Sequence, residues 1–504
     1  MLQRLIQNTL ITGLSFFFTG LVPLLLVPLF LKQYGVEQYG VLVVVRLLLP
    51  TGALAVFDPG LPETTSYAIA KARHDDDWSR CGRYLGGLVA ISLLLGVIAA
   101  GALVLAEPTL AALFGISTPL RPGFSHIVYA TAASFPLLLA SLVAEGVLKG
   151  FEDFKRLRSF DVLSIAVYAA AAVGAVWTSL TFEWIALIYV LYGVFRTGLI
   201  TALAWRYLHR RAAKMARPQP AEWRELKNRC VPLWLNRCIG VAQGHAAPLL
   251  IGALMGTAAV GLFDLVMRIP RFLKVVTGIL NSAVLPVVLR LDEAGDRAGL
   301  QRLLQLGLLG VLSVVAPIVA WGVCFSEPML RLWVSEKYST LWHWQSLMFA
   351  WPLINAVTSF SCGALLGRPR FVAVLNWIVL GQIGIQLATS IALIPFFSAQ
   401  AFIAGQILAL SISLPFQLWL VFNVCGLHAQ EFKRHLGVLV IFAAPVAAAL
   451  AFDAGHAIST IPQLIASLTA WCAVSALLVW SAVFSSAERA TVASMLTRRF
   501  RRKA

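Results

Sequence analysis

Charged residues are scarce in this chain of 504 residues, because only 12% are Asp, Glu, Lys or Arg, about half the share in soluble domains. Acidic side chains are the scarcer kind, with 23 Asp and Glu against 40 Lys and Arg. Hydrophobic residues make up 59% of the chain and the mean hydropathy is +0.81. A soluble fold cannot cover so much apolar surface. The composition therefore excludes a string of soluble domains and predicts that lipid is the main solvent.

Paired cysteines and catalytic motifs are also missing. The seven cysteines are scattered and none forms a C-x-x-C pair, so we expect apolar packing residues rather than metal ligands or a disulfide framework. No G-x-S-x-G, H-E-x-x-H or P-loop motif occurs, and the longest expected outward loop, residues 107–123, has one carboxylate, Glu107. These absences predict a transporter rather than an enzyme with an aqueous active site. They indicate neither a metal nor a cofactor.

Long apolar runs are what the chain does have. Each spanning helix needs about 20 apolar residues, and the first run continues at full length without a small-residue cleavage site, so we expect an uncleaved first helix. The sequence predicts an all-α polytopic membrane protein with about 14 transmembrane helices. The runs lie near residues 8–31, 39–57, 84–106, 124–148, 160–179, 184–205, 231–252, 260–289, 303–325, 341–366, 371–394, 400–424, 435–453 and 462–484.

Basic residues are distributed unevenly between the loops. Thirty of the 40 lie on one side of the predicted membrane, including eight in 206–230 and six after residue 484. The opposite loops hold four: Lys32, Arg121, Arg331 and Lys337. The positive-inside rule therefore predicts that both termini are cytoplasmic. The excess positive charge is mainly a topology signal, with a smaller contribution from anionic membrane lipids, and it indicates no nucleic-acid partner.

An internal repeat with a shift of about 220 residues relates two parts of the chain. The matched positions include Gly35 with Gly256, Asp77 with Asp296, Glu107 with Glu327, Gly146 with Gly363, and Gly150 with Gly367. Each copy has six predicted helices, an even number, so both copies have the same orientation in the membrane. Secondary transporters are often built this way, with the substrate site at the repeat interface. The predicted domains are an N-terminal six-helix lobe (1–205), a basic cytoplasmic linker (206–230), a C-terminal six-helix lobe (231–425), and two extra helices with a basic tail (426–504).

The segment between the first and third predicted helices carries a family resemblance. It contains Gly35, then Tyr39 and Gly40 opening the second helix, then DPGL at 58–61 before a cytoplasmic segment. This pattern resembles polysaccharide and O-antigen (Wzx-type) flippases of the multidrug/oligosaccharidyl-lipid/polysaccharide exporter superfamily. Two six-helix lobes with two extra helices match that architecture over nearly the whole chain.

The resemblance implies a flippase of the bacterial cytoplasmic (inner) membrane. Its substrate would be a polyprenyl-pyrophosphate-linked oligosaccharide, the repeat unit of lipopolysaccharide O-antigen or exopolysaccharide. The substrate would cross from the cytoplasmic to the outer leaflet by alternating access. Glycan polymerase machinery would be a further partner.

Basic residues inside the apolar runs are the candidate site. Each costs about 2.5–3.5 kcal/mol to insert at mid-membrane, and acids there are fewer, so the region is net positive and suits an anion. Arginine pairs bidentately with phosphate oxygens. The alternatives are an Asp264–Arg268 helix pair and snorkelling of Arg46 and Arg237. Arg271 is expected to have no carboxylate partner, and Arg196 to be nearly silent. The predicted pyrophosphate site is Arg46, Arg268, Arg271, Lys274 and Arg237.

Polar side chains at helical spacing suggest a further wall of this site. They either hydrogen-bond sugars or join helices to each other. Glu145 and Asp264 are candidate coupling groups for H⁺ or Na⁺, although a local pair of Glu145 with Lys149 at i+4 is the stronger interpretation. His245 is expected to be a packing residue. The predicted polar wall is Asn8, Thr12 and Ser15 in the first helix, with Asn236 and Gln243 in the seventh.

Two other functions stay open at this point. A multidrug exporter of the same superfamily would share the architecture, but cationic drugs favour a cavity rich in carboxylates rather than arginine. A membrane-embedded glycan polymerase or glycosyltransferase would need a sizeable aqueous face with acid or base residues, which the short outward loops do not provide. The flippase is therefore the preferred interpretation.

Overall fold

The computed structural model describes residues 2–211, 214–365, 368–427, 433–451, 455, 457–483 and 489. Within these residues every regular element is a helix. The long helices are α1 (Leu2–Leu47), α3 (Trp78–Leu113), α4 (Arg121–Gly150), α5 (Phe154–Trp177), α6 (Phe182–Arg210), α7 (Pro220–Glu293), α8 (Arg297–Cys324), α12 (Pro369–Phe397), α13 (Ala401–Cys425), α14 (Lys433–Ala451) and α15 (Ile461–Ala482). The shorter ones are α2 (Leu61–Asp75), α9 (Ser326–Trp333), α10 (Trp342–Met348), α11 (Ala350–Cys362), η1 (Ala53–Phe57), η2 (Thr118–Leu120), η3 (Glu336–Leu341), η4 (Gly363–Leu365) and η5 (Ser398–Gln400).

The number of apolar helices agrees with a multi-pass membrane protein. In the described part of the chain, 11 segments are long and apolar enough to span a membrane. Three of them each overlap two of the predicted runs: Ile11–Leu47, Pro220–Lys274 and Arg370–Cys425. Every predicted run thus overlaps one of these segments, although Ile11–Leu47 ends within the run 39–57 and Pro220–Lys274 within the run 260–289. The all-α polytopic fold predicted from composition is confirmed.

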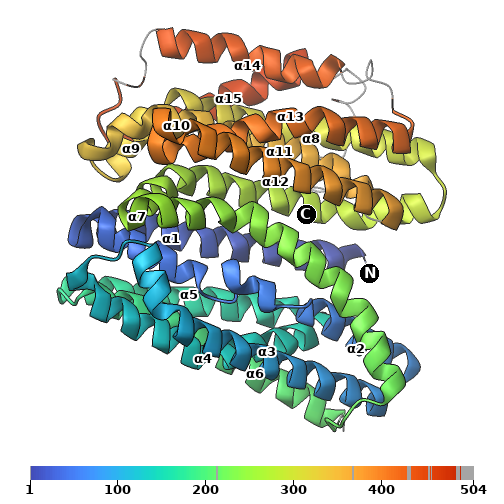
Figure 1. Cartoon of the computed structure of the whole chain (residues 1–504). Helices are drawn as coiled ribbons and strands as arrows, with labels where there is room; N and C mark the ends of the chain where they lie inside the picture. Colours follow the sequence, from blue (N-terminus) through green and yellow to red (C-terminus); the bar gives the residue numbers. More distant parts are fainter. Residues whose placement is uncertain are drawn as a thin grey trace, which may run out of the picture. The chain divides into compact units, whose positions relative to one another are not determined.

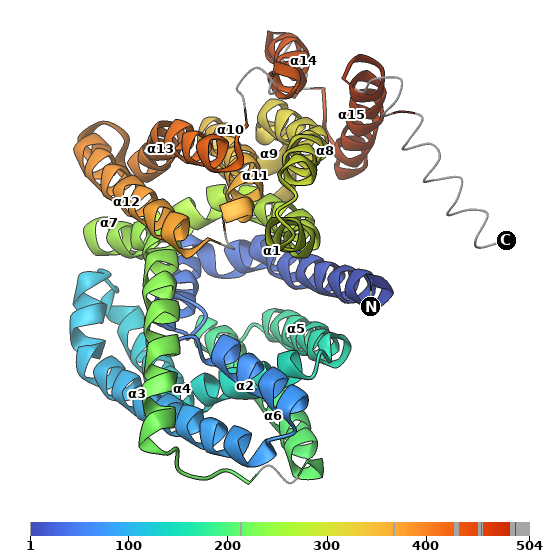
Figure 2. The same ribbon diagram turned by 90° about the vertical axis from the view of Figure 1, so that its right-hand side faces the viewer.

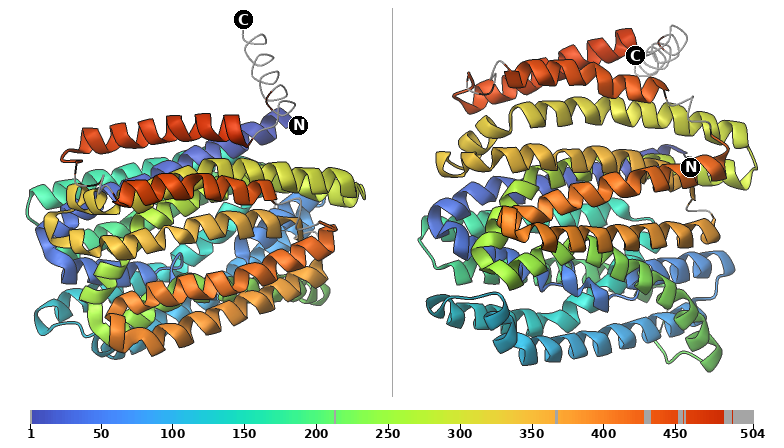
Figure 3. Two further views of the ribbon diagram at one scale, coloured as in Figure 1. Left: turned by 90° about the horizontal axis from the view of Figure 1, so that it is seen from above. Right: turned by 45° about the horizontal axis from the view of Figure 1, so that its top comes forward.

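The chain divides into two compact units, residues 1–272 with 379–405, and residues 273–378 with 406–504. In the first unit α4 packs against both α3 and α6, and α5 packs against α1 and α6 (Figure 1). In the second unit α14 and α15 lie beside α8 (Figures 2 and 3). The predicted six-helix lobes are defined by the sequence repeat, whereas these two units are defined by how tightly the residues pack. The lobes therefore stay a prediction.

Two glycines bend the two longest helices at matched positions of the repeat. Gly35 in α1 has φ 76° and ψ 176°, and Gly256 in α7 has φ 79° and ψ 178°. A positive φ of this size favours glycine, because it has no Cβ. The sequence match of Gly35 with Gly256 is therefore also a match of backbone conformation.

The segments after these bends cross each other closely within the first unit. A Cβ added to Gly40 would overlap the carbonyl oxygen of Thr257, and one added to Gly261 would lie 2.6 Å from the carbonyl oxygen of Val36. Each contact joins the fifth residue after one bend to the first residue after the other. The crossing thus has local twofold symmetry, and it needs a glycine on both sides.

At two other repeat matches, the contacts of the matched residues can be compared between the two copies. Asp77 accepts a hydrogen bond from Arg80 N–H at 2.9 Å, and Asp296 accepts one from Gly299 N–H at 2.8 Å, so both cap a helix start. Gly146 packs against Pro62 and Thr65 in α2, whereas a Cβ on Gly363 would have no neighbour within 4 Å among the described residues. Gly367 lies outside the described residues.

The second predicted run, 39–57, is interrupted in the structure. α1 ends at Leu47 and η1 follows before α2 begins at Leu61. The break falls at Pro50, which has no N–H to continue an α-helix. Asp58 then accepts hydrogen bonds from the N–H groups of Gly60 and Leu61 at 3.0 and 2.8 Å. The DPGL segment is therefore a helix-starting turn.

The linker packs against the N-terminal end of α3. The carbonyl groups of Lys214 and Ala216 lie where Cβ atoms on Gly82 and Gly86 would be. Just beyond them, Glu222 pairs with Arg83 at 2.9 Å. The linker is therefore held along α3 on both sides of the start of α7.

Candidate substrate-binding cavity

A cavity of about 560 Å³ lies within the first unit, a size typical of small-molecule sites. Its walls come from α1, α2, α4, α5, α6 and α7, with the break between α1 and α2. Among the described residues, charged groups of both signs line it in equal number, so their formal charges sum to zero. The carboxylates are Asp58, Glu63, Glu145 and Asp161, and the basic groups are Lys149, Arg158, Arg196 and Arg237.

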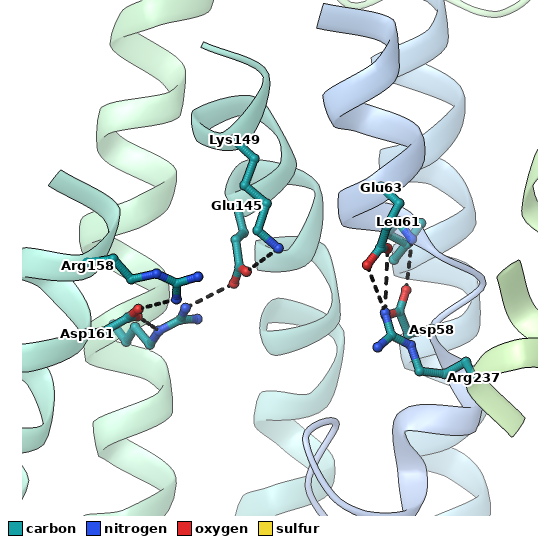
Figure 4. A network of polar contacts seen from close by, with 9 residues as sticks. Asp58, Leu61, Glu63, Glu145, Lys149, Arg158, Asp161 and Arg237 are labelled. Carbon is teal, nitrogen blue, oxygen red and sulfur yellow. Dashed lines mark hydrogen bonds and ion pairs between the residues drawn. The ribbon is translucent and has the colours of Figure 1, made fainter. Parts of the chain in front are cut away.

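Arg196 is the centre of one ion-pair network in this cavity. Its guanidinium lies 2.9 Å from a carboxylate oxygen of Glu145 and 2.7 Å from one of Asp161. Glu145 also pairs with Lys149 at 2.9 Å, and Asp161 with Arg158 at 2.8 Å, so the charges alternate (Figure 4). Arg196 is thus paired with two carboxylates, and its expected silence in transport stays a prediction. The expected Glu145–Lys149 pair is confirmed.

Arg237 forms a second ion-pair group. It lies 2.9 Å from a carboxylate oxygen of Asp58 and 3.3 Å from one of Glu63 (Figure 4). Burial raises the pKa of the Asp58 carboxyl, although the Leu61 N–H and Arg237 act against this shift. Arg237 is thus paired across helices, and snorkelling does not describe it.

A smaller cavity of about 380 Å³ shares Arg237 and Glu63 with the larger one. Asn236 and His245 line this second cavity. It extends the polar surface along α7 within the first unit.

Asp264 is the centre of a separate cluster on α7. It is buried, and its carboxylate accepts hydrogen bonds from the Tyr39 hydroxyl at 2.6 Å, from Arg271 at 3.1 Å and from Arg268. Arg268 also donates to the Tyr39 oxygen at 2.8 Å. The expectation that Arg271 has no carboxylate partner is therefore wrong. The physical reason is the i, i+4, i+7 spacing, which places both arginines on the face of Asp264.

Arg46 adds a third guanidinium to this region. It lies 5.0 Å from the ring centroid of Tyr189 and interacts electrostatically with Asp264 and Arg268. Among the described residues it forms no ion pair with a carboxylate. In the part of the chain that the structure describes, this region thus holds three guanidinium groups and one carboxylate, and the Asp264 cluster, counted with Arg46, has a formal charge of +2.

Three tyrosines connect the Asp264 cluster with the main cavity. Tyr189 and Tyr192 line the cavity, and buried Tyr168 contacts both rings at centroid distances of 5.3 and 5.7 Å. Sequence reasoning did not select them. The available signal was the i, i+3 spacing of Tyr189 and Tyr192 in α6, the helix of Arg196; Tyr168 lies in α5 and had no such signal.

The other predicted residues are placed as follows. Lys274 belongs to the second unit, where its ammonium lies 4.6 Å from the ring centroid of Trp351. Ser15 donates to the Arg158 carbonyl at 3.4 Å, which joins α1 to α5. Thr12 is half-buried, Gln243 is exposed, and the side chain of Asn8 lies outside the described residues. Thr19, the last residue of the same predicted polar stripe on the first helix, lines the main cavity.

Comparison with solved structures shows which known folds the chain shares. The fold is similar to that of lipid II flippase MurJ in an inward closed conformation, with a TM-score of 0.68 and 13% identity over 93% of this chain and 97% of that one. It is also similar to an inward-facing MATE multidrug resistance transporter, with a TM-score of 0.64 and 15% identity over 83% and 95% of the chains. A Pyrococcus furiosus transporter, described as having a binding pocket of reverse polarity, gives a TM-score of 0.61 and 14% identity over 84% and 97%. The chain thus has the fold of MOP-superfamily transporters.

The family follows from the sequence profile of polysaccharide biosynthesis proteins, which matches residues 5–292. This is more than half of the chain, and the chain belongs to that family. The resemblance seen in the first two helices is therefore confirmed. Among curated protein sequences, none matches the chain.

Proposed function

We propose that this protein is a flippase that moves a polyprenyl-pyrophosphate-linked oligosaccharide from the cytoplasmic to the outer leaflet of a bacterial inner membrane. Membership of the polysaccharide biosynthesis family supports a glycan-related substrate. The fold shared with a lipid II flippase supports transport by alternating access. Cytoplasmic termini and a glycan polymerase partner are parts of the same proposal.

The observation that carries the proposal is the +2 charge of the Asp264 cluster. Buried charges are costly in a membrane protein unless they are paired, and one carboxylate cannot neutralise Arg46, Arg268 and Arg271. A pyrophosphate would supply the missing negative charge and acceptors for the guanidinium forks. Lys274 stays a proposed additional ligand.

Arg271 is the cluster member best placed to turn toward a ligand. Its side chain is 39% exposed, whereas that of Asp264 is 5% exposed. Asp264 keeps hydrogen bonds from Arg268 and Tyr39 if Arg271 moves away. Arg271 can therefore exchange partners without leaving a buried carboxylate unpaired.

A surface-glycan complementation assay in cells tests the proposal. Arg271→Ala should abolish glycan export while membrane abundance stays near wild type, since Asp264 stays paired. Arg271→Lys should rescue in part, because a point charge cannot replace the bidentate fork.

The matched control is Arg224→Ala, which removes an exposed arginine from the same helix. Arg196→Ala is unsuitable as a silent control because of its ion pairs. Full glycan export by Arg271→Ala would contradict the proposed site. A cell that lacks the protein gives a second test. If it loses drug resistance and keeps its surface glycan, the multidrug exporter is favoured.

A further inference from the structure

We infer that the main cavity of the first unit is a binding site for an uncharged sugar, the one joined directly to the pyrophosphate, with Tyr189 and Tyr192 as its stacking surface. This inference rests on the proposed function and adds a subsite to it. It replaces neither the Asp264 cluster nor the predicted polar wall on α1.

The first step is the shared position of Tyr189. Its ring faces Arg46 at 5.0 Å, and the same residue lines the cavity. A pyrophosphate held by Arg46 would therefore have its attached group next to the cavity. The sugar follows the pyrophosphate in the substrate, and the cavity lies next to Arg46 in the protein.

The second step is the chemistry of the walls. Tyr189 and Tyr192 lie with ring centroids 5.7 Å apart and half-buried, and buried Tyr168 supports both from behind. Two supported aromatic rings at a cavity wall provide a fixed apolar surface with polar hydroxyl ends. The C–H face of a sugar ring is apolar and its rim is made of hydroxyl groups, so both parts have a counterpart here.

The third step is the charge balance. The cavity presents carboxylates that accept hydrogen bonds and guanidinium groups that donate them, and their formal charges cancel. Such a wall can bond the hydroxyl groups of a neutral sugar, each of which donates and accepts. A carboxylated sugar would gain no net attraction. The cationic Asp264 cluster and the neutral cavity thus divide the substrate into an anionic and an uncharged part.

Tyr192 gives the cleaner test, because Tyr189 also contacts Arg46. Full-length protein in lipid nanodiscs is titrated with undecaprenyl pyrophosphate and with the same lipid carrying one N-acetylglucosamine. Wild type should bind the sugar-bearing lipid more tightly. Tyr192→Ala should lower that affinity about three- to tenfold and leave the affinity for the bare lipid unchanged. Tyr192→Phe, which keeps the ring, should stay within about twofold of wild type.

Binding of the lipid without a sugar tests the pyrophosphate site separately from the sugar subsite. It also shows that each variant is folded. Equal wild-type affinity for both lipids, or a sugar contribution that survives in Tyr192→Ala, overturns the sugar subsite alone. Failure of wild type to bind either lipid overturns the proposed function, and the sugar subsite with it. An equal loss for both lipids in Tyr192→Ala, reversed in Tyr192→Phe, would show that the ring supports the charged cluster and would also overturn the inference.

Discussion

At the residue scale, Asp264 holds more of the structure than its single charge suggests. It is the one carboxylate in hydrogen-bond contact with Arg268, Arg271 and Tyr39 in the described part of the chain. Without a ligand, it is what limits the repulsion between the arginines. Its structural role and the functional role of Arg271 can therefore be separated by substitution.

Asp264→Asn should be destabilising, because it leaves the buried guanidinium groups without a counter-charge. Removing one partner of a buried pair costs about 3–5 kcal/mol of unfolding free energy, which thermal unfolding of the purified protein should detect. Arg271→Ala should unfold near the wild-type temperature. The double variant Asp264→Asn with Arg268→Gln should recover part of the loss. Equal stability of Asp264→Asn and wild type would show that Asp264 does not hold the arginines.

The Arg196 network gives a second residue-scale prediction. Arg196→Ala removes the guanidinium that pairs with both Glu145 and Asp161. Each carboxylate is left with one cation, Lys149 for Glu145 and Arg158 for Asp161. We expect a loss of about 1–3 kcal/mol, the cost of lost hydrogen bonds to buried charged groups, with Arg196→Lys in between. Chemical unfolding in detergent measures it. An unchanged midpoint for Arg196→Ala would mean that the network contributes no stability.

Which ion pairs the sequence predicts depends on how far apart the two residues lie along the chain. The Asp264–Arg268 and Glu145–Lys149 pairs have i, i+4 spacing, so a helix places them together and the sequence predicts them. Arg196 meets residues 51 and 35 positions away, and only the packing of α4, α5 and α6 brings them together. No local rule contains that information.

At the element scale, the sequence predicted where helices lie better than where they bend or break. Apolar length fixes the presence of a span, and Gly35 and Gly256 were visible as a repeat. The bends at these two glycines depend on a positive φ angle. A glycine can adopt this angle but does not have to, so the sequence alone does not predict the bends. The break after Leu47 had a local signal, Pro50, which the long apolar run 39–57 concealed.

The crossing after the two bends makes a graded prediction. Gly40→Ala should be the most damaging change, since its Cβ would overlap the Thr257 carbonyl, and Gly261→Ala should be milder because its Cβ would lie 2.6 Å from the Val36 carbonyl. Gly240→Ala in α7 is the matched control, because its Cβ would have no neighbour within 4 Å in the described part of the chain, and it should be neutral or slightly stabilising. Fluorescence-detected gel filtration and thermal unfolding rank the three. The reverse order for Gly40 and Gly240 would contradict the crossing.

At the scale of the whole molecule, the predicted orientation sets the direction of transport. In a cysteine-free background, Ser335→Cys should react with an impermeant thiol reagent from outside intact cells. Met215→Cys in the basic linker should react only after the cells are opened, because positive loops stay in the cytoplasm. External labelling of Met215→Cys would reverse the orientation and the direction of the proposed flipping.

The paired glycine contacts have a consequence for the origin of the chain. Gly40 meets Thr257 and Gly261 meets Val36, the pattern of an isologous interface in which one patch pairs with its own copy. In a half-length ancestor that formed a homodimer, one bend glycine and one contact glycine would supply both sides of the crossing at once. In this chain the two sides are encoded separately. Each can then accumulate different substitutions: position 43, which matches Asp264, holds Val, whereas Arg268 has a basic counterpart one place from its matched position, at Arg46.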